Sequence, residues 1–90
     1  MLVRTLKAIV WGRVQGVFYR ASTKEAAIAL RLNGYAKNLI NGDVEVEVTG
    51  QEPQLMALIE YLKQGPVQAQ VKSVTWEYIE TVHFEGFRIK

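Results

Sequence analysis

The residues best suited to chemistry gather in one stretch near the N-terminus, WGRVQGVFYR, which runs from Trp11 to Arg20. It holds two glycines and several apolar residues, and it ends on an arginine. Arginine carries a permanent positive charge on a planar fork that can bind two oxygens of one phosphate or carboxylate group. The chemistry that these residue types indicate is the binding of an anion.

The loop 15–19 of this stretch would offer backbone amides to the same anion. These amides lie between an expected strand and an expected helix, so several lack an obligatory partner within the chain. Gly16 can adopt a positive φ, which turns successive N–H groups into a concave nest, and the following helix points its positive end at the same place. Anions bind readily at such helix starts. We therefore expect an anion cradle here, with Arg20 supplying the full charge.

A plainer interpretation of the same stretch remains open. Glycines after a strand commonly serve only to turn the chain, and a basic residue in the first turn of a helix is commonly solvated. The helix dipole disfavours a cation at that end, and an anion between Arg20 and the helix would remove this conflict. The loop alone fits the plainer interpretation slightly better.

Composition excludes several other kinds of site. The chain has 90 residues, 49% of them hydrophobic and 22% charged, which is typical of one globular domain spanning residues 1–90. It has no cysteine, which excludes disulfides, thiolate nucleophiles and thiolate metal sites and is compatible with a reducing cytoplasm. No apolar run approaches the ~20 residues needed to cross a bilayer, and the N-terminus lacks the pattern of a signal peptide. We therefore expect a cytoplasmic protein that does not associate with membranes.

Charge is unevenly distributed along the chain. Residues 1–37 hold seven basic side chains and one acidic side chain, a net +6, and residues 38–90 hold four basic and eight acidic side chains, a net −4. A basic first half suits an anionic ligand, although a solvated basic face is the commoner cause of such a bias. His83, the single histidine, falls in an expected connecting segment, where a surface role is favoured over acid–base chemistry.

The first half of the chain predicts the elements that would hold the loop in place. Residues 2–14 alternate as a strand, and a helix is expected from Tyr19 or Arg20 through residue 32, with an apolar stripe at the three-and-four spacing of a buried face. Asn33-Gly34 is expected to end this helix, since glycine takes the left-handed turn that closes a helix. The expected inward residues are Leu6, Ala8, Val10 and Val14 in the strand and Tyr19, Thr23, Ala26, Ala27 and Leu30 in the helix, while Thr5 is expected at a polar position.

A hairpin is predicted next. YAKNL, residues 35–39, reads as a short strand, and VEVEVTG, residues 44–50, reads as a longer one whose valines face the core. The Asn41-Gly42 pair between them is the strongest short-range signal for a hairpin turn. Glu45 and Glu47 alternate with the valines, so we expect both carboxylates on the solvated face.

A second helix and two more strands complete the pattern. Pro53 suits the first turn of that helix, where its missing amide proton is not needed, and Gly65-Pro66 ends it. The expected core stripe of this helix is Leu55, Leu58, Ile59 and Leu62. Residues 74–78 mark a fourth strand, and FRIK at the C-terminus could form a short fifth. The order strand, helix, strand, strand, helix, strand predicts an α+β, ferredoxin-like sandwich, with a four-stranded antiparallel sheet in the order 4-1-3-2 and both helices on one face.

Two motifs resemble those of the acylphosphatase family. GRVQGVFYR, residues 12–20, matches the signature in which Gly-x-Val-Gln-Gly-Val is followed by two residues and an arginine. GYAKNLINGDVEV, residues 34–46, matches the second motif, in which a glycine, an aromatic, a small apolar and a basic residue precede an asparagine and a Gly-containing turn. The departures are mild, because Ala36 stands where valine is frequent and Asn41 where aspartate is frequent. The resemblance covers essentially the whole chain.

This resemblance implies an enzyme that hydrolyses acyl phosphates, the mixed anhydrides of a carboxylic acid and phosphate, to carboxylate and inorganic phosphate. By position it implies that Arg20 and Asn38 are the catalytic pair, with the Asn38 amide orienting the attacking water. It implies no metal and no cofactor, and we expect a monomer that acts on this small-molecule substrate and binds no nucleic acid. The residues implied to hold the phosphoryl group through their backbone amides are Gln15, Gly16, Val17, Phe18 and Tyr19.

The alternative is an RNA-binding or small-ligand-binding module of the same fold without catalysis, because such modules share the order of strands and helices. NGYAKNLI echoes part of an RNA-recognition signature. However, Asn33 replaces the basic lead residue, and Lys37 and Leu39 stand where the stacking platform would be built. Regulatory small-ligand domains of this fold usually occur as repeats or fused to an enzyme.

Overall fold

The strands and helices follow one another in the order expected from the sequence. A computed structural model describes residues 2–90. Within this range, no helix has both the length and the apolar character needed to span a membrane. The elements are β1 (Arg4–Arg13), α1 (Tyr19–Ala29), β2 (Asn33–Asn38), β3 (Val44–Gly50), α2 (Glu52–Gln64), β4 (Gln70–Ile79) and β5 (Phe87–Ile89).

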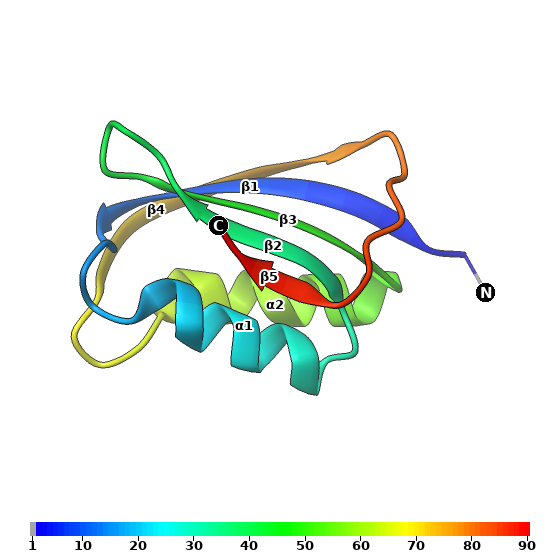
Figure 1. The fold of residues 1–90 in the computed structure, drawn as a ribbon, viewed down its shortest axis with the longest axis horizontal. Coiled ribbons are helices and arrows are strands. Elements are labelled where there is room, and N and C mark those ends of the chain that lie inside the picture. The colour runs from blue at the N-terminus through cyan, green and yellow to red at the C-terminus, as the bar shows by residue number, and fades with distance from the viewer. Residues whose placement is uncertain (1) are drawn as a thin grey trace.

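All five strands belong to one sheet, in the order β4-β1-β3-β2-β5. The first four strands of the chain pair antiparallel, and β5 runs parallel to β2 at the edge. Both helices cover the same face of the sheet, as Figure 1 shows. The ferredoxin-like sandwich with the order 4-1-3-2 is therefore confirmed, and so is the short fifth strand.

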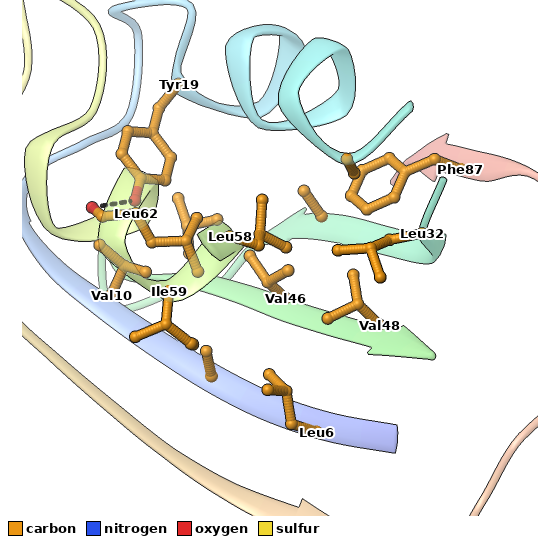
Figure 2. Close-up of a cluster of buried hydrophobic side chains, with 14 of the residues drawn as sticks. Leu6, Val10, Tyr19, Leu32, Val46, Val48, Leu58, Ile59, Leu62 and Phe87 are labelled. Atoms are coloured by element: carbon orange, nitrogen blue, oxygen red, sulfur yellow. Dashed lines mark hydrogen bonds between the residues drawn. The ribbon is translucent and has the colours of Figure 1, made fainter. Parts of the chain in front are cut away.

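The core lies between that face of the sheet and the two helices. Figure 2 shows the inward valines of β3 packed near the leucines of α2. Tyr19, in the first turn of α1, is buried there as well, and its hydroxyl donates a hydrogen bond to the Leu62 carbonyl at 2.7 Å. This contact fixes the start of α1, and with it the preceding loop, against the end of α2. The buried residues that the sequence predicted are Leu6, Ala8, Val10, Val14, Thr23, Ala27, Val44, Val46, Val48, Leu55, Leu58, Ile59 and Leu62, and Ala26 and Leu30 are partly buried.

The end of α1 differs from the expectation. The helix ends at Ala29, three residues early, and the left-handed position belongs to Arg31, with φ 60°. The Arg31 amide donates to the Ile28 carbonyl at 3.0 Å and the Leu32 amide donates to the Ala27 carbonyl at 2.8 Å. This pair of bonds is the Schellman motif, which closes a helix on orphan carbonyls. The residue after this left-handed turn, Leu32, is buried, as is common for the residue that follows such a turn.

Gly34, which was expected to end α1, lies instead within β2. A Cβ atom at this position would clash with the carbonyl oxygen of Glu47 on the neighbouring strand β3. The glycine is therefore needed for the close approach of two strands. The expectation that it ends the helix was wrong, because the sequence pattern does not show which strand lies against it.

The face of the sheet away from the helices is partly covered by the segment 80–86, which leads from β4 to β5. The Val82 amide donates to Thr5 Oγ1 at 2.9 Å, and the Val82 carbonyl accepts from Thr49 Oγ1 at 2.6 Å. The two threonine oxygens lie 2.6 Å apart. Thr5 is completely buried by this arrangement, although the sequence indicated only a polar position. The threonine pair therefore anchors the segment that delivers β5 to the edge of the sheet.

The two carboxylates of β3 are not simply solvated, as the alternation suggested. The Tyr35 hydroxyl lies 2.8 Å from Glu45 Oε2 and 2.7 Å from Glu47 Oε2, and Lys7 Nζ lies 3.3 Å from Glu45 Oε1. Burial raises the pKa of Tyr35, and the two carboxylates raise it further, so the phenol stays protonated and donates. Only the register of β2 against β3 brings Tyr35 opposite Glu47, and this register is not visible in one strand's pattern.

Candidate active site

A hollow of about 270 Å³ lies where the loop after β1, the first turn of α1, the end of β2 and the edge strand β5 meet. It brings together Arg20 and Asn38, which are distant in sequence, with part of the loop that the sequence predicted as a cradle. The side chains of two loop residues point elsewhere, because Val17 is buried in the core and Gln15 contacts the turn after β2. The lining residues are Val14, Gly16, Phe18, Tyr19, Arg20, Ala21, Asn38 and Ile89.

The loop has the backbone geometry of a nest. Gly16 has φ 74° and Phe18 has φ 63°, and Val17 between them is not among the residues with positive φ. Alternation of the sign of φ turns successive N–H groups toward one concave side, where they can bind an anion. A Cβ atom at Gly16 would meet no atom within 4 Å, so the left-handed φ is the reason for glycine here.

The amides of residues 15–20 donate no hydrogen bond to any group of the described residues. The helix that follows, α1, also lacks a side-chain cap and has no acidic residue in its first turn. In contrast, α2 carries Glu52 in its first turn. The N-terminus of α1 therefore has partial positive charge and free donors that the chain itself does not neutralise.

Arg20 is half-buried at the same hollow. Its Nη1 atom donates to the main-chain oxygen of Lys90 at 2.7 Å. Across residues 2–90, its guanidinium forms no ion pair with an acidic side chain. The hydrogen bond to Lys90, directly after β5, thus orients the guanidinium, and no acidic side chain of the described residues pairs with it.

Asn38 is the last residue of β2, and its side-chain oxygen Oδ1 is buried. This oxygen accepts no hydrogen bond from the described part of the chain. A buried acceptor without a partner is destabilising by about 1–3 kcal/mol. Because Asn38 lines the hollow, a molecule bound there could supply the missing donor.

The side chain of Gln15 makes a link that the sequence analysis missed. Its Nε2 atom donates to the Leu39 carbonyl at 2.9 Å and to the Asp43 carbonyl at 2.9 Å. These carbonyls belong to the turn that directly follows Asn38. One amide group therefore ties the loop after β1 to the end of β2. The only available signal was that the signature specifies a glutamine at this position.

The sequence analysis also did not assign the end of β5 and the residue after it to the site. Ile89 lines the hollow, and the Lys90 carbonyl accepts from Arg20. The FRIK pattern indicates a strand but not its neighbour. The parallel pairing with β2 sets Ile89 opposite Ala36, two residues before Asn38, and both Ile89 and Asn38 line the hollow. No signal in the sequence alone would have assigned these two residues to the site.

Among the described residues, no titratable side chain other than Arg20 brings charge to the hollow. Burial raises the pKa of Tyr19, and its hydroxyl donates into the core, so this lining residue stays neutral and structural. His83 and Lys37 are exposed and do not line the hollow. In the described range, no three side chains of His, Cys, Asp and Glu gather as metal ligands. The charge available at the hollow therefore comes from Arg20 and the backbone amides.

Comparison with known proteins agrees with this geometry. A family model described as acylphosphatase matches residues 6–89. Curated acylphosphatases are 44% identical over 85 residues in Coxiella burnetii (strain Dugway 5J108-111), covering 94% of this chain and 90% of that one, and 45% identical over 89 residues in Vibrio parahaemolyticus, covering 99% of each. The solved acylphosphatase structure from Coxiella burnetii superposes with a TM-score of 0.95 at 41% identity, covering 98% of this chain and 93% of that one. From its fold, its loop and these relatives, the chain belongs to the acylphosphatase family.

Proposed function

We propose that this chain hydrolyses acyl phosphates to carboxylate and inorganic phosphate, with the phosphoryl group held by Arg20 and the backbone amides of residues 15–19. The observation that carries the proposal is the meeting, at one hollow, of amides without partners among the described residues and a guanidinium that pairs with none of their acidic side chains. A phosphoryl group satisfies both, because it offers several oxygen acceptors and up to two negative charges.

The cradle acts mainly on the transition state. In phosphoryl transfer the protein contributes positioning and stabilisation of charge on the equatorial oxygens. Donors that are already oriented, such as the amides of the nest and the Arg20 guanidinium, strengthen their bonds as charge develops and need no reorganisation at that moment. Arg20 is oriented by its bond to Lys90, which supports this role.

Asn38 holds the attacking water. Its buried Oδ1 accepts a hydrogen bond from one O–H group of the water. This bond directs a lone pair of the water oxygen toward phosphorus. The new bond forms between the water oxygen and phosphorus, and the bond between phosphorus and the acyl oxygen breaks with its electron pair leaving on the carboxylate. The water proton passes to a phosphoryl oxygen. Asn38 orients and does not act as a base.

The nature of the leaving group explains why the reaction needs no further catalytic groups. A carboxylate is stable as an anion and leaves without protonation, so neither a strong base nor a metal ion is needed. The negative charge of the phosphoryl oxygens, which a metal ion would otherwise neutralise, is stabilised by Arg20 and by the positive end of α1. The sequence supports this assignment, since it contains one histidine and no cysteine.

The RNA-binding alternative is not favoured. In such modules the open face of the central strands carries aromatic side chains that stack on bases. Here the corresponding face of β3 carries Glu45 and Glu47, whose hydrogen-bond partner is Tyr35. Two carboxylates at the centre of that face repel a phosphate backbone. We further propose that the chain acts as a monomer, in the cytoplasm, on a small-molecule substrate.

The experiment that tests the function is a spectrophotometric assay of benzoyl phosphate hydrolysis in the presence and absence of a chelator. We expect turnover that the chelator does not reduce, because Arg20 and the amides supply the charge. Loss of activity with chelator would contradict the metal-free mechanism, and absence of turnover under both conditions would contradict the function.

A binding measurement on the same sample separates the two classes of function. A ligand that binds only the native state raises its stability, by about 2.7 kcal/mol at a hundredfold excess over the dissociation constant. Millimolar inorganic phosphate should therefore raise the thermal unfolding temperature more than potassium chloride of equal ionic strength. Single-stranded RNA at a matched phosphate concentration should give no shift, and a larger shift with RNA would favour the binding module.

The link from Gln15 to the turn after β2 predicts a positioning effect. Gln15→Met keeps the length of the side chain and removes both hydrogen bonds, so the end of β2 can move relative to the cradle. Small displacements of a positioning group cost up to about 10²-fold in rate, and we expect kcat to fall about tenfold or more while protection by phosphate is largely retained. The measurement is kcat for benzoyl phosphate.

A double-mutant cycle separates this role from a general loss of stability. In the Asn38→Ala background, Gln15→Met should lower kcat little further, because the group that it positions is gone. Equal effects in the two backgrounds would show that Gln15 does not act through Asn38. Gln64→Met, at an exposed position of α2, is the matched control.

A further inference from the structure

The mouth of the hollow is apolar on one side. Phe18 is 78% exposed and Ile89 is 43% exposed, and both line the hollow together with Arg20 and Asn38. Exposed large apolar side chains are common one at a time on protein surfaces. Two of them from distant parts of the chain, both beside a polar site, form a surface that a bound molecule can cover.

The backbone of Phe18 ties its ring to the cradle. This residue is the N-cap of α1 and has φ 63°, a conformation that costs a residue with a Cβ atom roughly 1–2 kcal/mol. Glycine or asparagine would adopt it more easily. Instead the chain places an aromatic ring on a residue whose amide belongs to the nest. A group that is covalently joined to the bound phosphoryl group therefore has this exposed ring within the lining of the same hollow.

Charge limits what that group can be. Arg20 is the one charged side chain among the described residues that line the hollow, and the phosphoryl group engages it. A carboxylate on the acyl portion of the substrate would find no second cation there. An aromatic or branched apolar acyl group would instead cover exposed carbon surface.

From these observations, which rest on the proposed function, we propose that Phe18 and Ile89 form an acyl-binding wall. The wall favours acyl phosphates with aromatic or bulky apolar acyl groups over those with small or anionic ones. An aromatic ring that covers such a surface gains apolar burial and an aromatic contact. We expect this gain to appear as about a tenfold preference in kcat/KM.

The test compares benzoyl phosphate with acetyl phosphate. For the native protein, the ratio of kcat/KM for benzoyl phosphate to that for acetyl phosphate, each corrected for its uncatalysed rate of hydrolysis, should be about ten or more. Phe18→Ala keeps the Cβ atom and thus the same backbone strain, and it should lower this ratio about tenfold, mainly through KM. Ile89→Ala should lower the ratio by a smaller factor. Ile28→Ala is the matched control, because Ile28 is 56% exposed on α1 but does not line the hollow.

A binding measurement keeps the proposal testable apart from catalysis. Benzoylphosphonate and acetylphosphonate resemble the two substrates and are not hydrolysed, so calorimetry should show the same preference for the aromatic compound and its loss in Phe18→Ala. The proposal of an acyl-binding wall is wrong if the native protein binds both phosphonates with equal affinity, or if Phe18→Ala lowers the affinity for both by the same factor. This holds even when acyl phosphates are hydrolysed. If the preference in binding is found without turnover, the wall stands and the proposed reaction fails.

Discussion

Replacing Arg20 with alanine should lower kcat/KM for benzoyl phosphate by at least about 10²-fold, by analogy with removal of an oxyanion-stabilising donor. Among the described residues that line the hollow, the substitution removes the one full positive charge and leaves the partial charges of the amides and the helix. It should also abolish the protection by inorganic phosphate, because product and transition state share the same oxygens. The measurements are steady-state kinetics and thermal unfolding with and without phosphate.

Two further variants sharpen this result. Lys24→Ala removes a basic residue from the same helix outside the hollow, and it should change neither rate nor protection. Arg20→Lys keeps the charge but loses the planar fork and the hydrogen-bond geometry toward Lys90, so it should recover only part of the activity. Retention of phosphate protection in Arg20→Ala would remove Arg20 from the cradle.

Replacing Asn38 with alanine should separate rate from binding. The buried Oδ1 atom and its hydrogen-bonding capacity are lost, whereas Arg20 and the amides of the nest are untouched. We expect kcat to fall about 10²-fold, since positioning of the nucleophile is a large part of such a barrier, and we expect inorganic phosphate to protect the variant almost as well as the native protein.

The opposite pattern would exclude this role. Unchanged turnover in Asn38→Ala would show that the water is oriented by another group, and loss of phosphate protection would place Asn38 in the cradle instead. Asn33→Ala is the matched control, because this asparagine is exposed at the other end of the same strand. It should leave kcat unaltered.

The fold was largely predictable because its signals are local. The valines of VEVEVTG, the stripe of α2 and the Asn41-Gly42 turn each indicate their element without knowledge of a partner. Short connections and antiparallel pairing then left one arrangement. The end of α1 was misassigned because Arg31, and not a glycine, takes the left-handed turn, and no local pattern marks an arginine for that conformation.

The site was predictable only in part. Arg20 and the glycine loop are adjacent in sequence, so their pattern indicated an anion cradle, but Asn38 was assigned to it by resemblance alone. The links that place Asn38, from Gln15 to the Leu39 and Asp43 carbonyls, join segments about 24 or more positions apart. The contribution of Ile89 requires the parallel pairing of β5 with β2. Such contacts depend on tertiary structure and leave no local pattern.

The interior position of β1 in the sheet has a consequence for how tightly the site can bind an anion. This strand is paired on both sides for most of its length, with β3 over Arg4–Val10 and with β4 over Thr5–Arg13. Strands of this kind open only with the whole molecule, so their amide hydrogens exchange slowest. The loop 15–19 follows this strand after the buried Val14 and leads into a helix anchored by Tyr19. Little conformational entropy remains to be lost when an anion enters, and most of the interaction free energy is available for affinity.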